Sequence, residues 1–200
     1  MDQGLRDLLA NYCNEWSSAV ETILGPGARA SKIVFNNHFL IPETGAGGFA
    51  DDGNVLVLAF DVSFQDRNQQ IKNLKASFFH ESYHIAQGWL GDTILPAIDE
   101  AILEGAATVF ERVRAGSTPP WGSYDSWETM TKLVPVVTEL DTHYDQGKWK
   151  YFDEETGQKW VLYRLGTFIV DEMLRNNTGV TIEAAVKMTA DDILTKAGLN

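Results

Sequence analysis

Apolar residues of the chain recur mostly three or four positions apart, which is the spacing of an amphipathic helix. Gly25-Pro26-Gly27 ends the first such segment, and Thr189-Ala190-Asp191-Asp192 resembles a capping box before the last one. The pattern predicts helices over residues 5–24, 71–89, 96–113, 130–140 and 160–174, with further helical turns from Thr181 onward.

Two short runs instead have the composition of β-strands, Ser31–Phe35 and Asn54–Phe60. The second follows Asp52-Gly53, a dipeptide typical of hairpins, and is apolar on both faces. It is therefore either a buried strand or an edge strand that could pair with an extended peptide. Residues 148–152 are either a strand or an irregular excursion.

The Gly-rich segment Pro42–Gly48 is predicted to be a flexible connection, because no Lys-Ser/Thr follows it as in a phosphate-binding loop. Taken together, the elements predict an α+β fold that is mainly helical, with a small N-terminal sheet. The length of 200 residues and the hydrophobic content of 44% suit a single domain over residues 1–200.

Composition narrows the range of partners. The net charge of −12 argues against binding to nucleic acid or to anionic membranes. No apolar run approaches the ~20 residues of a membrane span, and the N-terminus lacks the features of a signal peptide, so a cytoplasmic location is expected. The single cysteine, Cys13, excludes an internal disulfide and is expected to pack on the first helix. Nothing in the pattern indicates an oligomeric state.

The sequence His80-Glu81-Ser82-Tyr83-His84 fits the pattern H-E-x-x-H within the helix predicted over residues 71–89. Residues four apart lie on one helix face, so His80 and His84 would direct two imidazoles at one point, as a Zn²⁺ site requires. Glu81 would reach a water rather than the metal. Asp66 or Asn68 can cap this helix at its start, and Gly88 and Gly91 mark its end.

A catalytic zinc site needs a third protein ligand. The metzincin pattern would require a histidine at position 90, where the chain has leucine. Glu104, among small apolar residues on the next helix, is the favoured candidate, since a carboxylate buried there needs a cationic partner. Glu100, one turn earlier, is the competing ligand, although its place near the helix start is explained by the helix dipole. Thr108 could hydrogen-bond a ligand, and Gly105 would allow two helices to approach closely.

His80-Glu81-x-x-His84 followed by Glu104-Gly105-Ala106-Ala107 resembles the gluzincins, the thermolysin-like clan of zinc metallopeptidases, and is similar to small bacterial predicted zinc-dependent proteases with the E-G-x-A form. Tyr163-Arg164-Leu165-Gly166 resembles the downstream Y-x-x-G stretch of such proteases. Thermolysin itself has an aspartate where this chain has Thr108, a departure that weakens close kinship with thermolysin but not with the clan.

The resemblance implies a zinc metallopeptidase that hydrolyses peptide or protein substrates, with His80, His84 and Glu104 as ligands and Glu81 as the general base. Tyr163 is the first candidate for the donor that stabilises the oxyanion, and His143, with its neighbour Tyr144, is the second. His38 is expected to be structural. The alternative function is a non-catalytic, metal-stabilised binding or regulatory domain derived from a protease fold, in which Glu81 would have no task.

Overall fold

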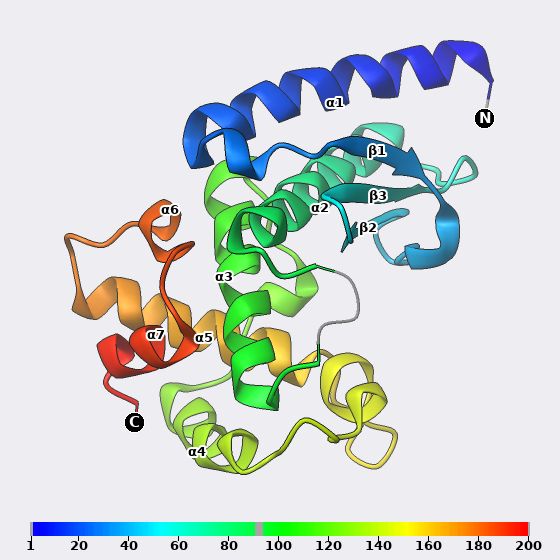
Figure 1. The fold of residues 1–200 in the computed structure, drawn as a ribbon. Coiled ribbons are helices and arrows are strands. Elements are labelled where there is room, and N and C mark those ends of the chain that lie inside the picture. The colour runs from blue at the N-terminus through cyan, green and yellow to red at the C-terminus, as the bar shows by residue number, and fades with distance from the viewer. Residues whose placement is uncertain (1, 91–93, 200) are drawn as a thin grey trace. The chain divides into compact units, whose positions relative to one another are not determined.

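The computed structural model describes residues 2–90 and 94–199, which form two compact units. Unit 1 consists of residues 1–93 with 113–117, and unit 2 of residues 94–112 with 118–200. Helices dominate and the strands are confined to the N-terminal part, so the predicted α+β class is confirmed (Figure 1). The prediction of a single domain over residues 1–200 stays a prediction. No helix among the described residues is long and apolar enough to cross a membrane.

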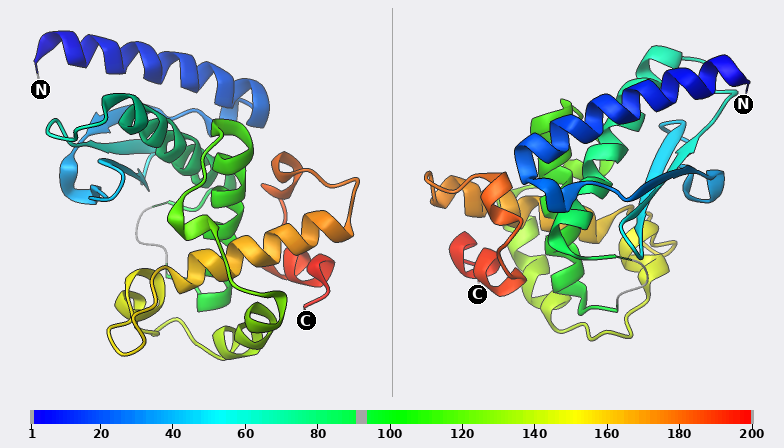
Figure 2. Two further views of the ribbon diagram at one scale, coloured as in Figure 1. Left: turned by 180° about the vertical axis from the view of Figure 1, so that it is seen from behind. Right: turned by 45° about the horizontal axis from the view of Figure 1, so that its top comes forward.

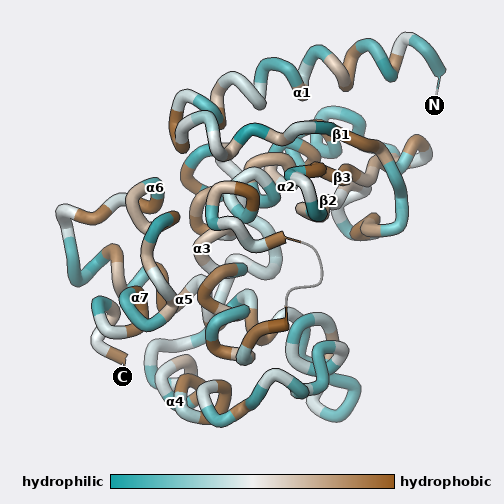
Figure 3. Tube along the Cα trace, viewed as in Figure 1, coloured by the Kyte–Doolittle hydropathy of each residue, from teal (hydrophilic) through white to brown (hydrophobic). Residues whose placement is uncertain are grey.

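Unit 1 is built from two long helices and a three-stranded sheet. Its main elements are α1 (Gln3–Leu24), β1 (Lys32–Phe35), β2 (Ala46–Asp51), β3 (Val55–Phe60) and α2 (Arg67–Gln87), with single 3₁₀ turns at Pro26–Ala28 and Asn37–Phe39. α2 packs on β2 and β3, and α1 packs on α2, where Trp16 meets the edge of Phe78 with ring centroids 5.6 Å apart. The tube of α1 alternates between hydrophilic and hydrophobic residues, as expected for a helix with one buried face (Figure 3).

β3 is the central strand of the sheet, whose order is β1-β3-β2. It pairs with β1 in parallel and with β2 in antiparallel, and Leu56, Leu58 and Phe60 are almost completely buried. Both edges of β3 are therefore occupied. Of the two alternatives for Asn54–Phe60, the buried strand is confirmed and pairing of a peptide with an open edge of this strand is wrong.

The segment Pro42–Gly48 is not a flexible connection throughout, because Ala46, Gly47 and Gly48 belong to β2. The sequence does not indicate this strand, because glycine has no side chain and so cannot contribute to the alternation of apolar and polar residues that predicts a strand. At Gly47 the reason for glycine is a close approach: a Cβ atom there would lie 2.0 Å from the carbonyl oxygen of Phe39. The Asp52-Gly53 turn was predicted correctly, and it leads from β2 into β3.

α5 (Val161–Asn176) is the helix against which much of unit 2 packs (Figure 2). The other elements are α3 (Ala97–Ala115, with residues 97–112 in this unit), a 3₁₀ turn at Pro120–Gly122, α4 (Trp127–Thr138), the π-helical segment η4 (Gly147–Tyr151), α6 (Ile182–Ala185) and α7 (Ala190–Ala197). Thr189 and Asp192 form the predicted capping box of α7. Residues 147–151 are helical, so the strand alternative for 148–152 is wrong.

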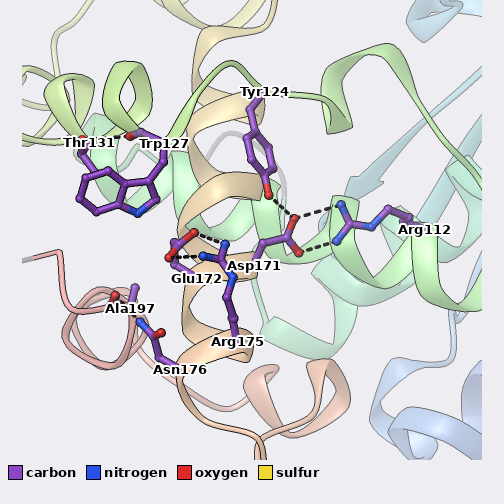
Figure 4. Close-up of polar contacts among 9 residues, drawn as sticks. All are labelled: Arg112, Tyr124, Trp127, Thr131, Asp171, Glu172, Arg175, Asn176 and Ala197. Carbon is purple, nitrogen blue, oxygen red and sulfur yellow. Dashed lines mark hydrogen bonds and ion pairs between the residues drawn. The ribbon is translucent and has the colours of Figure 1, made fainter.

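A polar network ties α3 to α5 within unit 2. Asp171 on α5 accepts hydrogen bonds from both terminal nitrogens of Arg112 on α3 and from the hydroxyl of Tyr124, the last at 2.9 Å. The bidentate contact with Arg112 and the approach of Tyr124 are visible in Figure 4. Burial, followed by the negative charge of Asp171, raises the pKa of Tyr124 to about 12. The Asp171 carboxylate is thus held by three donors from two other segments.

One cavity, of about 530 Å³, belongs to unit 1 and lies away from the predicted chemistry. Its lining comes from α1 and β1: Arg6, Ala10, Cys13, Asn14, Ile33 and Phe35. Cys13 is buried there on the first helix as expected, and burial raises the pKa of its thiol to about 11. None of the residues predicted to bind metal or to act in catalysis lines this cavity.

Candidate metal centre

The two histidines of the motif lie in the last turns of α2, in unit 1. The side chain of Asp66 caps the start of this helix by accepting from the amide of Gln69. Gly88, with a left-handed φ of 77°, ends it by donating to the carbonyls of His84 and Ile85. Asp66 and Gly88 are therefore the predicted boundaries that the structure confirms, and Gly91 lies outside the described residues.

The imidazoles of His80 and His84 converge within α2. Their Nε2 atoms are 3.1 Å apart, and the two residues are only 6% and 5% exposed. Nδ1 of His84 lies 2.9 Å from Oε1 of Gln87, a contact that holds the imidazole ring in place. The edge of the His84 ring also meets Trp89, with centroids 4.6 Å apart. The pair presents ring nitrogens to one point, which is the arrangement expected of two metal ligands on one helix.

Glu81 is 9% exposed and lies against strand β2. A Cβ atom on Gly48 would come within 2.7 Å of the Cγ of Glu81, so this side chain passes over a position where β2 has no side chain of its own. Gly48 thus leaves the room that the Glu81 side chain occupies. The sequence alone could not show this relationship, because nothing in it relates position 48 to position 81.

Glu104 lies on α3 in unit 2 and is 4% exposed. Its Oε1 is 3.0 Å from Nζ of Lys150, and the hydroxyl of Tyr163 is hydrogen-bonded to its carboxylate. Burial and then the charge of Glu104 raise the pKa of Tyr163 well above its usual value, so the phenol keeps its proton. Tyr163 was predicted as a donor to the reacting oxygen, and within unit 2 its partner is Glu104.

A contact between glycines sets Tyr163 beside Glu104. A Cβ atom on Gly105 would stand 2.0 Å from the carbonyl carbon of Gly166, and one on Gly166 would stand 1.6 Å from the carbonyl oxygen of Ala101. α3 and α5 therefore approach backbone to backbone at this point. Gly105 does permit a close helix approach, and its partner in unit 2 is α5.

Glu100, the competing ligand, is 3% exposed and has both carboxylate oxygens engaged. Oε1 lies 2.6 Å from Nζ of Lys150, and Oε2 accepts a hydrogen bond from the hydroxyl of Tyr144. Burial is the largest single influence on the pKa of Lys150 and lowers it, but its neighbours, with the carboxylates of Glu104 and Glu100 among them, together raise this pKa above its usual value. Lys150 is the residue of this group that the sequence analysis missed, since η4 has no periodic pattern to single it out.

The remaining candidates lie apart from these clusters. The His143 side chain is 88% exposed on a turn whose backbone amide donates to Asp141. His38 is exposed and meets Phe39 edge-on. Thr108 is completely buried, and within the described residues its hydroxyl has no hydrogen-bond partner, so the expected bond from Thr108 to a ligand is not formed.

The chemistry of the donor set suits zinc. His80, His84 and Glu104 are all buried, and each offers one ligand atom of a kind that zinc accepts, namely two imidazole nitrogens and one carboxylate oxygen. The first two belong to unit 1 and the third to unit 2. Glu81, adjacent to His80, does not belong to this group of three possible ligands.

Comparison with known proteins gives a family but no individual relative. No curated protein and no solved structure matches the chain. Residues 5–195 match the DUF2268 family, a span that includes His80, Glu81, His84 and Glu104. The chain therefore belongs to the DUF2268 family, which is described as "Predicted Zn-dependent protease".

Proposed function

We propose that the protein is a zinc metallopeptidase of the gluzincin type, with His80, His84 and Glu104 as the metal ligands and Glu81 as the general base. The observation that carries the proposal is the convergence of the two buried imidazoles, 3.1 Å apart at Nε2, on a helix that also bears Glu81. Membership of a family described as zinc-dependent proteases supports the same reaction class.

When bound, a zinc ion would supply Lewis acidity, which lowers the pKa of a water and polarises the substrate carbonyl. Glu81 accepts the proton of the attacking water and passes it to the amine that leaves. Gly48 leaves the room that the Glu81 side chain needs in this position, because a Cβ atom at residue 48 would lie only 2.7 Å from the Cγ of Glu81. Tyr163, which keeps its proton and is hydrogen-bonded to the proposed ligand Glu104, is the better supported of the two candidate donors to the oxyanion, since His143 is 88% exposed on a turn.

An extended peptide is the substrate that we propose for this site, bound along the outer edge of β2. The sheet order leaves β2 with one strand neighbour among the described residues, apart from an isolated bridge between Ile41 and Ala46. A peptide that pairs with this edge would gain main-chain hydrogen bonds. Because Gly48 of β2 lies against Glu81, such a peptide would run close to the base.

The decisive experiment measures bound zinc and peptide hydrolysis together. Wild type, His84→Ala and Glu81→Gln are analysed for metal content and incubated with a peptide library that is read by mass spectrometry. We expect the wild type to bind zinc and cleave, His84→Ala to lose both, and Glu81→Gln to keep zinc and lose cleavage. Wild type that has no affinity for zinc would exclude the proposal. Zinc binding without cleavage by the wild type would instead favour the metal-stabilised binding domain.

A further inference from the structure

One buried lysine holds two carboxylates of α3 at once. Nζ of Lys150 lies 2.6 Å from Oε1 of Glu100 and 3.0 Å from Oε1 of Glu104, and its side chain is 14% exposed. All three residues belong to unit 2. Glu100 is in turn fixed on its other oxygen by the hydroxyl of Tyr144. The contacts form a chain that runs from Tyr144 through Glu100 and Lys150 to Glu104.

We propose that the Glu100–Lys150 pair positions the carboxylate of Glu104 for metal binding. This inference rests on the proposed function, in which Glu104 is a zinc ligand. Lys150 and Glu100 act through Glu104 and are positioning residues: neither is assigned to the metal or to the substrate. A carboxylate at the end of a flexible side chain has several orientations, and donors that hold it, here Lys150 together with Tyr163, select among them.

Two facts argue for positioning over a simple charge effect. First, Lys150 and Glu100 carry opposite charges 2.6 Å apart, so the pair as a whole adds no net charge near Glu104. A lone lysine would repel a divalent cation, and Glu100 offsets that repulsion. Second, Tyr144 and Lys150 engage both oxygens of Glu100, so its carboxylate is committed to the network. A buried ionic group lowers the stability of a protein unless it is paired. Here Lys150 is paired with Glu100, and the same ammonium group also contacts the carboxylate of Glu104.

The same geometry argues against a different role for Lys150, the binding of a substrate's terminal carboxylate. A lysine that bound the terminal carboxylate of a substrate would need a side chain that is open to that substrate. Lys150 is largely buried and is engaged by Glu100 and Glu104. Its position therefore suits the support of Glu104 better than the recognition of a peptide end.

The test removes the pair without changing the net charge. We measure zinc affinity by chelator competition for wild type, Glu104→Gln, the double variant Glu100→Gln with Lys150→Met, and the triple variant that combines them. Loss of the partners that orient a metal ligand typically lowers affinity about 10- to 100-fold, and we expect a loss of this size for the double variant. The triple variant should bind no more weakly than Glu104→Gln, because the pair acts through that residue.

The chain offers a matched control two residues away. Lys148 lies in the same segment η4 and pairs with Glu155 at 2.7 Å, and these side chains are 37% and 80% exposed. Lys148→Met with Glu155→Gln makes the same chemical change to a surface pair, and its zinc affinity should stay within about twofold of wild type. Thermal unfolding of the metal-free variants verifies that each is folded.

A second readout reports geometry directly. The visible spectrum of the cobalt-substituted protein depends on the ligand arrangement, so the double variant should change its band shape while the surface control should not. Unchanged zinc affinity and an unchanged cobalt spectrum in the folded double variant would overturn the positioning role, as would a triple variant whose losses simply add. If Glu104→Gln itself keeps full zinc affinity, the ligand assignment in the proposed function fails, and that result is distinct from a failure of positioning alone.

Discussion

Gly105 and Gly166 touch through their backbones, so closely that a Cβ atom on Gly105 would stand 2.0 Å from the carbonyl carbon of Gly166. Each glycine is next to, or one turn from, a residue of the hydrogen-bonded pair Glu104 and Tyr163. Glu104 precedes Gly105 directly, and Tyr163 precedes Gly166 by about one helical turn. The helix contact therefore sets the position of the hydroxyl that bonds to Glu104.

Gly166→Ala should destabilise the protein. Alanine normally favours a helix over glycine by about 1 kcal/mol, but here its Cβ would lie 1.6 Å from the carbonyl oxygen of Ala101. We expect the free energy of unfolding to fall by about 1–3 kcal/mol, the usual cost of overpacking, in urea unfolding experiments. Gly179→Ala is the control, since a Cβ at Gly179 would meet nothing within 4 Å. Equal stability of the two variants would contradict the role of the glycine contact.

Gly48→Ala should impair hydrolysis while leaving zinc bound. The new methyl group would press on the Cγ of Glu81, 2.7 Å away, and so displace the carboxylate that we propose as the general base, and the three atoms nearest to this methyl group all belong to Glu81. Misplacement of a catalytic group by about 1 Å costs on the order of 100-fold in rate, so we expect kcat to fall about 10- to 100-fold. Steady-state kinetics and metal analysis check the two parts separately. Wild-type kcat in this variant would refute the placement of Glu81.

Asp171→Ala should destabilise unit 2, because two side chains would lose the acceptor of their hydrogen bonds. Arg112 and Tyr124 would lose their shared acceptor, and the Asp171 and Arg112 side chains are 18% and 32% exposed. We expect a loss of about 1–3 kcal/mol in the free energy of unfolding, which is below the cost for a fully buried pair because solvent screens part of the interaction. Glu128→Ala, which breaks the exposed pair with Lys132, should cost no more than about 1 kcal/mol.

Alkaline pH should weaken the fold through Cys13. Burial raises the pKa of its thiol from 9.0 to about 11 in the folded protein. The contribution of the protonated thiol is therefore fully present below pH 9.0 and is lost as the pH rises toward about 11. Two pH units correspond to about 2–3 kcal/mol. Between pH 9 and about 11, the free energy of unfolding of the wild type should decline by this amount relative to that of Cys13→Ala. If the free energies of the two proteins change with pH in parallel, the prediction is wrong.

Local signals in the sequence predicted much of the fold. Asp66 and Gly88, whose cap conformations follow from their chemistry, predict where the helix with the two histidines begins and ends, although this helix spans Arg67–Gln87 and not residues 71–89. The strand β3 was found because its apolar run is continuous. The strand β2 is not predicted, because Gly47 and Gly48 are explained by contacts in the folded chain, with the backbone of Phe39 and with the side chain of Glu81, and not by a local pattern of side chains.

In the candidate site, too, the part that depends on a local pattern is predictable from the sequence and the part that depends on packing is not. The histidine pair follows from helical periodicity, so the sequence predicts its geometry. The surroundings of Glu104 do not follow from any local pattern. Lys150 approaches it from a five-residue π-helical segment, and Tyr163 approaches through a contact between two glycines. Such contacts depend on how separate helices pack, which a single sequence does not display.

The central place of β3 in the sheet also has a consequence for how the chain folds during its synthesis. β3 is the last of the three strands to be made, yet both other strands pair with it. Until Phe60 has emerged, β1 and β2 have no sheet neighbour, and their backbone groups depend on water. α2 follows after residues 61–66 and packs on β2 and β3. A nascent chain that stalls before β3 would therefore display two unpaired strands, whereas one that reaches Gln87 holds both the sheet and the helix that carries the histidine pair.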